Sequence, residues 1–166
     1  MPQGSGGEIV HALKYGGWRK VAEPMGGRMA RTDWPADVVA ERTALIPVPL
    51  AAERQRERGY NQSELLARVI ARRWSVPVWG DVLVRRRKTR TQTKLTPGER
   101  VANVAGAFAV ADGAGPKLRG THLVLVDDVI TTGSTMNACA AALYDHGARI
   151  ISYVTFGRAR SASDGI

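Results

Sequence analysis

V-L-V-D-D-V-I-T-T-G-S-T-M-N-A-C-A-A-A, residues Val124 to Ala142, is the segment from which the architecture of this chain is most readily inferred. The apolar run 122–126 is rich in β-branched residues and predicts a strand buried on both faces. The segment 136–146 is rich in Ala and Leu and predicts a helix that ends at Gly147. Two carboxylates and a turn of glycine and hydroxyl residues lie between them. This order predicts a site for a sugar phosphate.

The turn and the acidic pair have separable roles in such a site. Gly133 allows successive backbone N–H groups to converge on a phosphate, and the N-terminus of the following helix favours negative charge. Asp127 and Asp128 are expected at the carboxyl end of the strand, where open α/β sheets bind their ligands. Carboxylates there can accept hydrogen bonds from vicinal sugar hydroxyls, or bind Mg²⁺ directly or through water. The P-loop and the dinucleotide fingerprint are both absent.

The twelve residues V-L-V-D-D-V-I-T-T-G-S-T resemble the phosphoribosyl-pyrophosphate (PRPP) binding motif of type I phosphoribosyltransferases. The resemblance implies an α/β fold with a central, mostly parallel sheet, flanking helices and a flexible lid loop. It implies that Asp127 and Asp128 are the catalytic pair, which holds the ribose hydroxyls and Mg²⁺. The implied 5′-phosphate loop consists of Val129, Ile130, Thr131, Thr132, Gly133, Ser134 and Thr135.

A second connection from strand to helix follows residues 43–50, T-A-L-I-P-V-P-L. Leu45 and Ile46 indicate a strand end, and the two prolines after them impose an extended exit. Asn61 is expected to cap a helix over residues 62–74. Residues 47–60 are therefore predicted to form a loop at the same sheet edge as the acidic pair.

This loop carries a second resemblance. P-V-P-L followed by R-x-R-x-x-R-G-Y-N-Q is similar to the ComF branch of the family. Type I members cradle pyrophosphate in this loop, and the planar fork of arginine suits a diphosphate. The alternative is a surface loop whose arginines pair with Glu53 and Glu57. The pyrophosphate-binding residues implied here are Pro49, Leu50, Arg54 and Arg58.

Positive charge is concentrated between Arg85 and Arg100, where seven basic residues and one acid give a net charge of +6 of the chain's +9. The spacing T-x-x-Q-x-x-L over 89–95 resembles the ComF branch, and type I enzymes commonly carry a flexible loop here. A cationic lid would neutralise pyrophosphate and exclude water. Contact with single-stranded nucleic acid and a solvated charge run remain as alternatives. The expected lid residues are Arg87, Lys88, Thr89, Gln92 and Lys94.

The length of 166 residues suits one domain built on a five-stranded sheet. We expect a disordered leader over residues 1–7, the phosphoribosyltransferase domain over 8–157 and a polar tail over 158–166. Four-residue spacing of apolar side chains indicates a helix over 18–29, which Gly26-Gly27 weakens. Many ComF-type proteins carry an N-terminal zinc module, which is not expected here.

Cys139, the single cysteine, cannot form an internal disulfide and is expected to be a small core residue. No signal peptide or membrane-spanning run is evident, so we expect a cytoplasmic protein without a membrane partner. Assembly as a homodimer is left open.

The resemblance implies an enzyme that binds PRPP with Mg²⁺ and transfers phosphoribose to an unidentified acceptor, releasing pyrophosphate. Two alternatives remain. One is a PRPP-binding regulator that carries out no chemistry, and the other is a factor that handles single-stranded DNA during competence.

Overall fold

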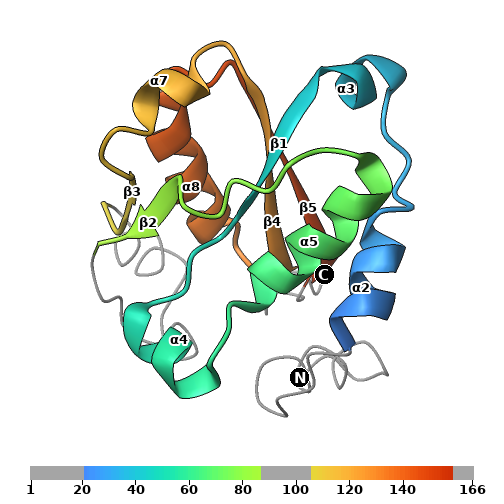
Figure 1. Ribbon diagram of the computed structural model, residues 1–166, viewed down its shortest axis with the longest axis horizontal. Helices are drawn as coiled ribbons and strands as arrows, with labels where there is room; N and C mark the ends of the chain where they lie inside the picture. The colour runs from blue at the N-terminus through green and yellow to red at the C-terminus, as the bar shows by residue number, and fades with distance from the viewer. Residues whose placement is uncertain (1–20, 87–105, 159–166) are drawn as a thin grey trace, which may run out of the picture.

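The computed structural model describes residues 21–86 and 106–158. Within these residues, three parallel strands lie in the order β1-β4-β5 at the centre of the molecule (Figure 1). Their bounds are Arg42–Pro47 for β1, His122–Ile130 for β4 and Ile150–Arg158 for β5. β4 is hydrogen-bonded on both sides, because Leu125 pairs with Ile46 of β1 and with Tyr153 of β5.

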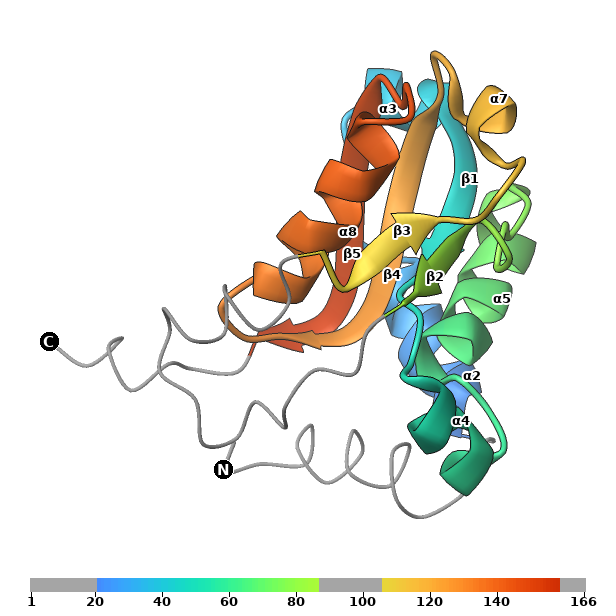
Figure 2. The same cartoon turned by 90° about the vertical axis from the view of Figure 1, so that its left-hand side faces the viewer.

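Helices cover both faces of this sheet (Figure 2). α2 (Ala22–Met29) and α5 (Gln62–Trp74) pack on one face, where Val124 and Val126 point. α8 (Ser134–Tyr144) packs on the other face, against the side chain of Leu125. Alternate residues of β4 therefore enter two separate apolar clusters. This confirms the prediction of a strand buried on both faces.

The five strands do not form one sheet, as the length had suggested. β2 (Leu83–Arg85) and β3 (Phe108–Val110) pair antiparallel in a small second sheet. The central sheet gains only an isolated parallel bridge at its other edge, between Leu45 and Val78. Pro77 lies just before that bridge and has no backbone N–H to donate, which keeps the pairing short.

Helix α5 begins and ends where the sequence indicated, with Asn61 as its N-cap. Two other boundaries differ. β4 continues through the acidic pair to Ile130, because Asp127 pairs with Thr155 and the ladder with β5 runs past the apolar residues. The segment expected to be a loop after β1 contains the helix α4 (Ala52–Arg58), which ends at Gly59 in the left-handed conformation.

The remaining elements are short. α3 (Ala36–Glu41) precedes β1 at the end of the sheet opposite to α4 (Figure 1). α7 (Gly115–Leu118) lies between β3 and β4. The expected leader over 1–7, the lid residues and most of the polar tail lie outside the described residues.

Candidate functional site

The acidic pair lies near the carboxyl end of β4 and is held by three hydrogen bonds. Asp127 Oδ1 accepts from Ser63 Oγ at 2.8 Å and from the backbone N–H of Asp128 at 2.9 Å. Asp128 Oδ1 accepts from the backbone N–H of Val129 at 2.9 Å. Asp128 is 2% exposed, whereas Asp127 is half-buried. The pair is therefore held in fixed orientations, through the backbone and through Ser63 at the start of α5.

The turn after β4 forms the N-terminus of α8. Gly133 has φ 77° and ψ −3°, the left-handed conformation that glycine adopts without strain, and it is the N-cap residue of the helix. Its carbonyl accepts from the N–H of Asn137 at 2.9 Å. The hydroxyls of Thr132 and Ser134 lie 2.8 Å apart, which ties the turn to the first residue of the helix. The expected 5′-phosphate loop thus has the helix N-terminus and the hydroxyl groups that an anion site requires.

The segment after β1 is fastened beside the acidic pair. The N–H of Val48 donates to the carbonyl of Val126 at 3.0 Å, which continues the β1–β4 ladder beyond Pro47. Asn61 donates through Nδ2 to the carbonyl of Val48 at 3.0 Å and accepts through Oδ1 from the N–H of Ser63 at 3.0 Å. Pro49 and Leu50 follow directly. The expected pyrophosphate segment is therefore anchored at the same sheet edge as the acidic pair.

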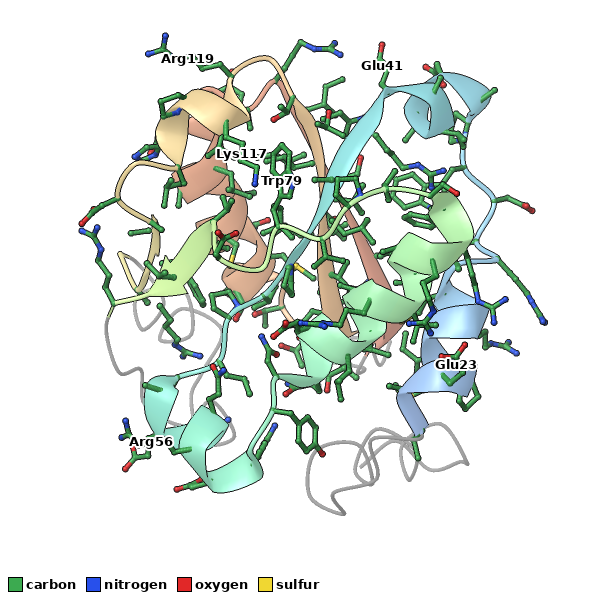
Figure 3. All side chains as sticks on the ribbon, viewed as in Figure 1. Glu23, Glu41, Arg56, Trp79, Lys117 and Arg119 are labelled. Atoms are coloured by element: carbon green, nitrogen blue, oxygen red, sulfur yellow. The ribbon has the colours of Figure 1, made fainter. Side chains whose placement is uncertain are left out.

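Helix α4 presents its arginines on different faces. Arg54 and Arg58 are four residues apart, share one helix face and are half-buried. Arg56 is exposed and its side chain points away from the sheet (Figure 3). Arg58 Nη1 donates to Gln62 Oε1 at 3.3 Å, so it lies against the start of α5. The two arginines expected to bind pyrophosphate are the two that face inward.

Arg85 was assigned by its sequence to the basic tract, yet it belongs to this site by its position. It is the last residue of β2, is half-buried, and its guanidinium lies 5.3 Å from the ring centroid of Phe108. Burial and the nearby charge of Arg54 lower its pKa, and the carboxylate of Asp127 acts in the opposite direction. Strand alternation could have separated Arg85 from Arg86, which is exposed and pairs with Asp112 at 3.1 Å.

Ser63 and Asn61 are the other residues that sequence reasoning did not assign to the site. The helix cap signal identified Asn61 only as a cap, and nothing in the sequence connects Ser63 to Asp127. The hydrogen bond between Ser63 and Asp127 spans 64 positions of the chain. Such a contact arises only once α5 packs against β4.

Cys139 is a core residue, as expected. It lies fully buried in α8, and burial raises the pKa of its thiol well above the ordinary range. A buried, protonated thiol is neither a nucleophile nor a metal ligand. The chemistry of the site therefore does not involve it.

The donor set of the site fits Mg²⁺. In the ranges 21–86 and 106–158, no group of three or more His, Cys, Asp or Glu side chains is placed to hold a metal ion. Asp127 and Asp128 nevertheless supply adjacent carboxylate oxygens. Mg²⁺ is commonly bound through one or two carboxylates together with substrate oxygens and water, so a site completed by the substrate suits this pair.

A hollow of about 380 Å³ lies against the outer part of β5, close to this edge. Thr155, one of its lining residues, is the register partner of Asp127. Two arginines contribute positive charge to its wall. The lining residues are Arg28, Met29, Arg31, Thr32, Thr155 and Phe156. Among the helices that the structure describes, none is long and apolar enough to cross a lipid bilayer.

Comparison with known proteins agrees with this geometry. A family model described as the phosphoribosyl transferase domain matches residues 61–164. Competence protein F of Haemophilus influenzae is 40% identical over 118 residues, which are 70% of this chain and 50% of that protein. DNA utilization protein YhgH of Salmonella typhi is 33% identical over 151 residues, which are 86% of this chain and 63% of that protein. The chain thus spans only half to 63% of the length of these two relatives.

Two further similarities are informative. Competence protein ComFC of Bacillus subtilis is 33% identical over 103 residues, 62% of this chain and 39% of that protein. A solved structure of glutamine PRPP amidotransferase from B. subtilis, complexed with ADP and GMP, matches 81% of this chain and 26% of that chain. Its TM-score is 0.53 at 19% identity, so this likeness concerns the fold alone.

Proposed function

Because the chain belongs to the type I phosphoribosyltransferase family, in its ComF branch, we propose that it binds PRPP with Mg²⁺ and transfers phosphoribose to an acceptor. The observation that carries the proposal is the hydrogen bond from Ser63 Oγ to Asp127 Oδ1. It joins the start of α5 to the acidic pair, which lies between the Gly133 turn and the anchored segment after β1. Groups that suit the ribose, the 5′-phosphate and the diphosphate therefore meet at one sheet edge.

Each part of this edge has a role in the proposed reaction. Asp127 and Asp128 accept hydrogen bonds from the ribose hydroxyls, and their negative charge favours the positive charge that develops at the anomeric carbon. The N–H groups and hydroxyls of residues 131–135 bind the 5′-phosphate. Arg54 and Arg58 balance the charge of the diphosphate. Any lid formed by the tract around Arg87 would exclude water.

The reaction balances without a protein nucleophile. The bond between the anomeric carbon and the diphosphate oxygen breaks, and its electron pair leaves with the diphosphate. The acceptor supplies an electron pair for the new bond to that carbon and loses a proton. Bound Mg²⁺ would supply charge neutralisation and a template, held by Asp127 and Asp128 directly or through water.

A pyrophosphate-release assay tests the proposed turnover. Wild type is incubated with PRPP, Mg²⁺ and a panel of acceptors that includes nucleobases and amines, and is compared with Asp127→Asn/Asp128→Asn. We expect release that depends on one acceptor class and falls by roughly a hundredfold or more in the double variant, a loss typical of removed charge stabilisation. Asp145→Asn, an exposed carboxylate after the far end of α8, is the control and should match wild type. Saturable PRPP binding without release for any acceptor would instead favour a regulator.

A second candidate function is the handling of single-stranded DNA. It is supported by the names of the relatives, competence protein F and DNA utilization protein, and by the +6 net charge of residues 85–100. Basic tracts follow phosphate backbones irrespective of base sequence. The two functions use different residues and are not exclusive.

A further inference from the structure

We propose that Arg85 is a diphosphate-binding residue fixed on β2, which acts with Arg54 of α4 on the same anion. The inference rests on the proposed function and extends it by assigning to the site a residue from the second sheet. It also divides the basic tract into two parts. Arg85 belongs to the site, and Arg86 belongs to the outer surface.

The position of Arg85 is set by the core. β2 pairs with β3 so that Arg85 lies opposite Phe108, and Leu83 and Phe108 both enter the apolar cluster beneath α8. The guanidinium lies 5.3 Å from the centroid of the Phe108 ring, a contact that aligns the charged group with the aromatic face. A half-buried arginine on a strand anchored in this way is held in place before any ligand binds.

The charges around Arg85 favour an anion. Arg54, from a different element, acts on it unfavourably, whereas Asp127 of the acidic pair acts on it favourably. Two guanidinium groups that repel each other in a partly desolvated place are stabilised when an anion binds to both. A diphosphate fits this arrangement, because each planar guanidinium can donate to two oxygens and the ligand carries several negative charges.

Arg86 provides a matched control within the same strand end. It has the same charge and side chain as Arg85, but it is exposed and donates to Asp112 Oδ1 at 3.1 Å. If positive charge near the tract were enough, the two residues would be equivalent. If position decides, only Arg85 matters.

The experiment is calorimetric titration of wild type, Arg85→Met, Arg85→Lys and Arg86→Met. The ligands are PRPP, inorganic pyrophosphate and ribose 5-phosphate, each with Mg²⁺. Methionine keeps an apolar side chain of similar length over Phe108 and removes the charge, whereas lysine keeps the charge and removes the fork. We expect Arg85→Met to weaken PRPP and pyrophosphate binding by roughly tenfold to a hundredfold. Ribose 5-phosphate binding should stay within about twofold, because that ligand lacks the diphosphate.

The other variants complete the test. Arg85→Lys should lie between wild type and Arg85→Met, and Arg86→Met should match wild type for all three ligands. Equal losses in Arg85→Met and Arg86→Met would overturn the inference, because general charge would then explain binding. Unchanged pyrophosphate binding in Arg85→Met would also overturn it. So would an equal loss of ribose 5-phosphate binding together with a lower unfolding temperature, since Arg85 would then only support the fold.

Failure of the proposed function has a different signature. If wild type binds none of the three ligands, the proposed function fails and the role of Arg85 fails with it. If wild type binds pyrophosphate but neither PRPP nor ribose 5-phosphate, the proposed function fails alone. The assignment of Arg85 to a diphosphate site would then still be supported by a loss confined to Arg85→Met.

Discussion

Single side chains determine how well the acidic pair is prepared for a ligand. Ser63 is buried and donates to Asp127 Oδ1 at 2.8 Å. Hydrogen bonds to ionised groups contribute about 1.5–3 kcal/mol, and Asp127 is only half-buried, so the lower end applies. Ser63 is therefore a positioning residue, which acts on the ligand through the carboxylate it holds.

Ser63→Ala should weaken PRPP binding by roughly threefold to tenfold and lower the free energy of unfolding by about 1 kcal/mol. The physical reason is that Asp127 loses a donor that fixes its orientation. Titration calorimetry and denaturant unfolding measure the two effects. Arg68→Ala, which breaks only the exposed ion pair with Glu64 on the same helix, is the control for binding. Equal PRPP affinity in Ser63→Ala and wild type would contradict the positioning role.

His122 has a different effect, at the amino end of β4. Its ring is buried, Nε2 lies 2.9 Å from Ser152 Oγ, and Nδ1 has no hydrogen-bond partner among the described residues. Burial lowers its pKa below the ordinary 6.5; Glu41 opposes this, and Arg149 and Arg42 add to it. The folded protein therefore keeps this imidazole neutral at a pH where the unfolded chain protonates it.

The free energy of unfolding should therefore fall as pH drops below about 6.5, because the unfolded chain then binds the extra proton. His122→Gln cannot take up that proton and should lose this part of the pH dependence. Urea unfolding at several values between about pH 5 and about pH 8, a range that spans the ordinary histidine pKa, measures the difference between the two proteins. Parallel stability curves for wild type and variant would show that His122 is not the responsible group.

At the scale of elements, the packing of α2 on α5 depends on Gly26. A Cβ atom placed there would lie 2.6 Å from Cβ of Val69 in α5, which is too close for a carbon contact. The next residue, Gly27, faces the flexible end of Arg73, whose Nη2 would lie 3.2 Å away. Adjacent glycines in one helix therefore differ in purpose, since only the first allows the helices to approach.

Gly26→Ala should destabilise the protein by about 1–3 kcal/mol through overpacking. Gly27→Ala should be neutral or stabilise it by up to about 1 kcal/mol, because alanine favours the helix and Arg73 can move. Thermal or denaturant unfolding of the two variants distinguishes them. Equal effects of the two substitutions would contradict the close approach at Gly26.

The extent to which the elements were predictable follows from where their signals lie. α5 was predicted with its bounds, because its cap and its apolar face are both local. α4 was missed, since A-E-R-Q-R-E-R has no apolar periodicity and only its helix propensity indicated a helix. β4 was predicted too short because Asp127 and Asp128 resemble the start of a turn, whereas pairing with β5 keeps them in the strand.

The site was predictable only in the parts that one segment supplies. The acidic pair and the Gly133 turn form one continuous motif, and both lie where the motif indicated. Ser63 and Arg85 come from α5 and β2, and their proximity to Asp127 results from tertiary packing. Charge alone could not distinguish Arg85 from Arg86, because that difference depends on which face of a strand each occupies.

At the scale of the whole molecule, the concentration of positive charge suggests a second use of the chain. If residues 85–100 bind single strands, affinity for a fluorescent oligonucleotide should fall steeply with salt. Substituting glutamine at Arg87, Lys88 and Arg90 should then reduce the log–log salt slope by about 0.7 for each phosphate that the variant no longer neutralises. Fluorescence anisotropy from low to physiological salt measures this slope. A slope that these substitutions leave unchanged would contradict nucleic-acid binding by the tract.

The central claim is that the acidic pair and the turn after β4 form a PRPP site. Its most direct test is calorimetric titration of PRPP with Mg²⁺ into wild type, Asp127→Asn/Asp128→Asn and the Asp145→Asn control. We predict saturable binding at one site per chain in wild type and the control, weakened by at least about tenfold in the double variant. Absence of PRPP binding in wild type, or equal affinity in wild type and the double variant, would contradict the claim.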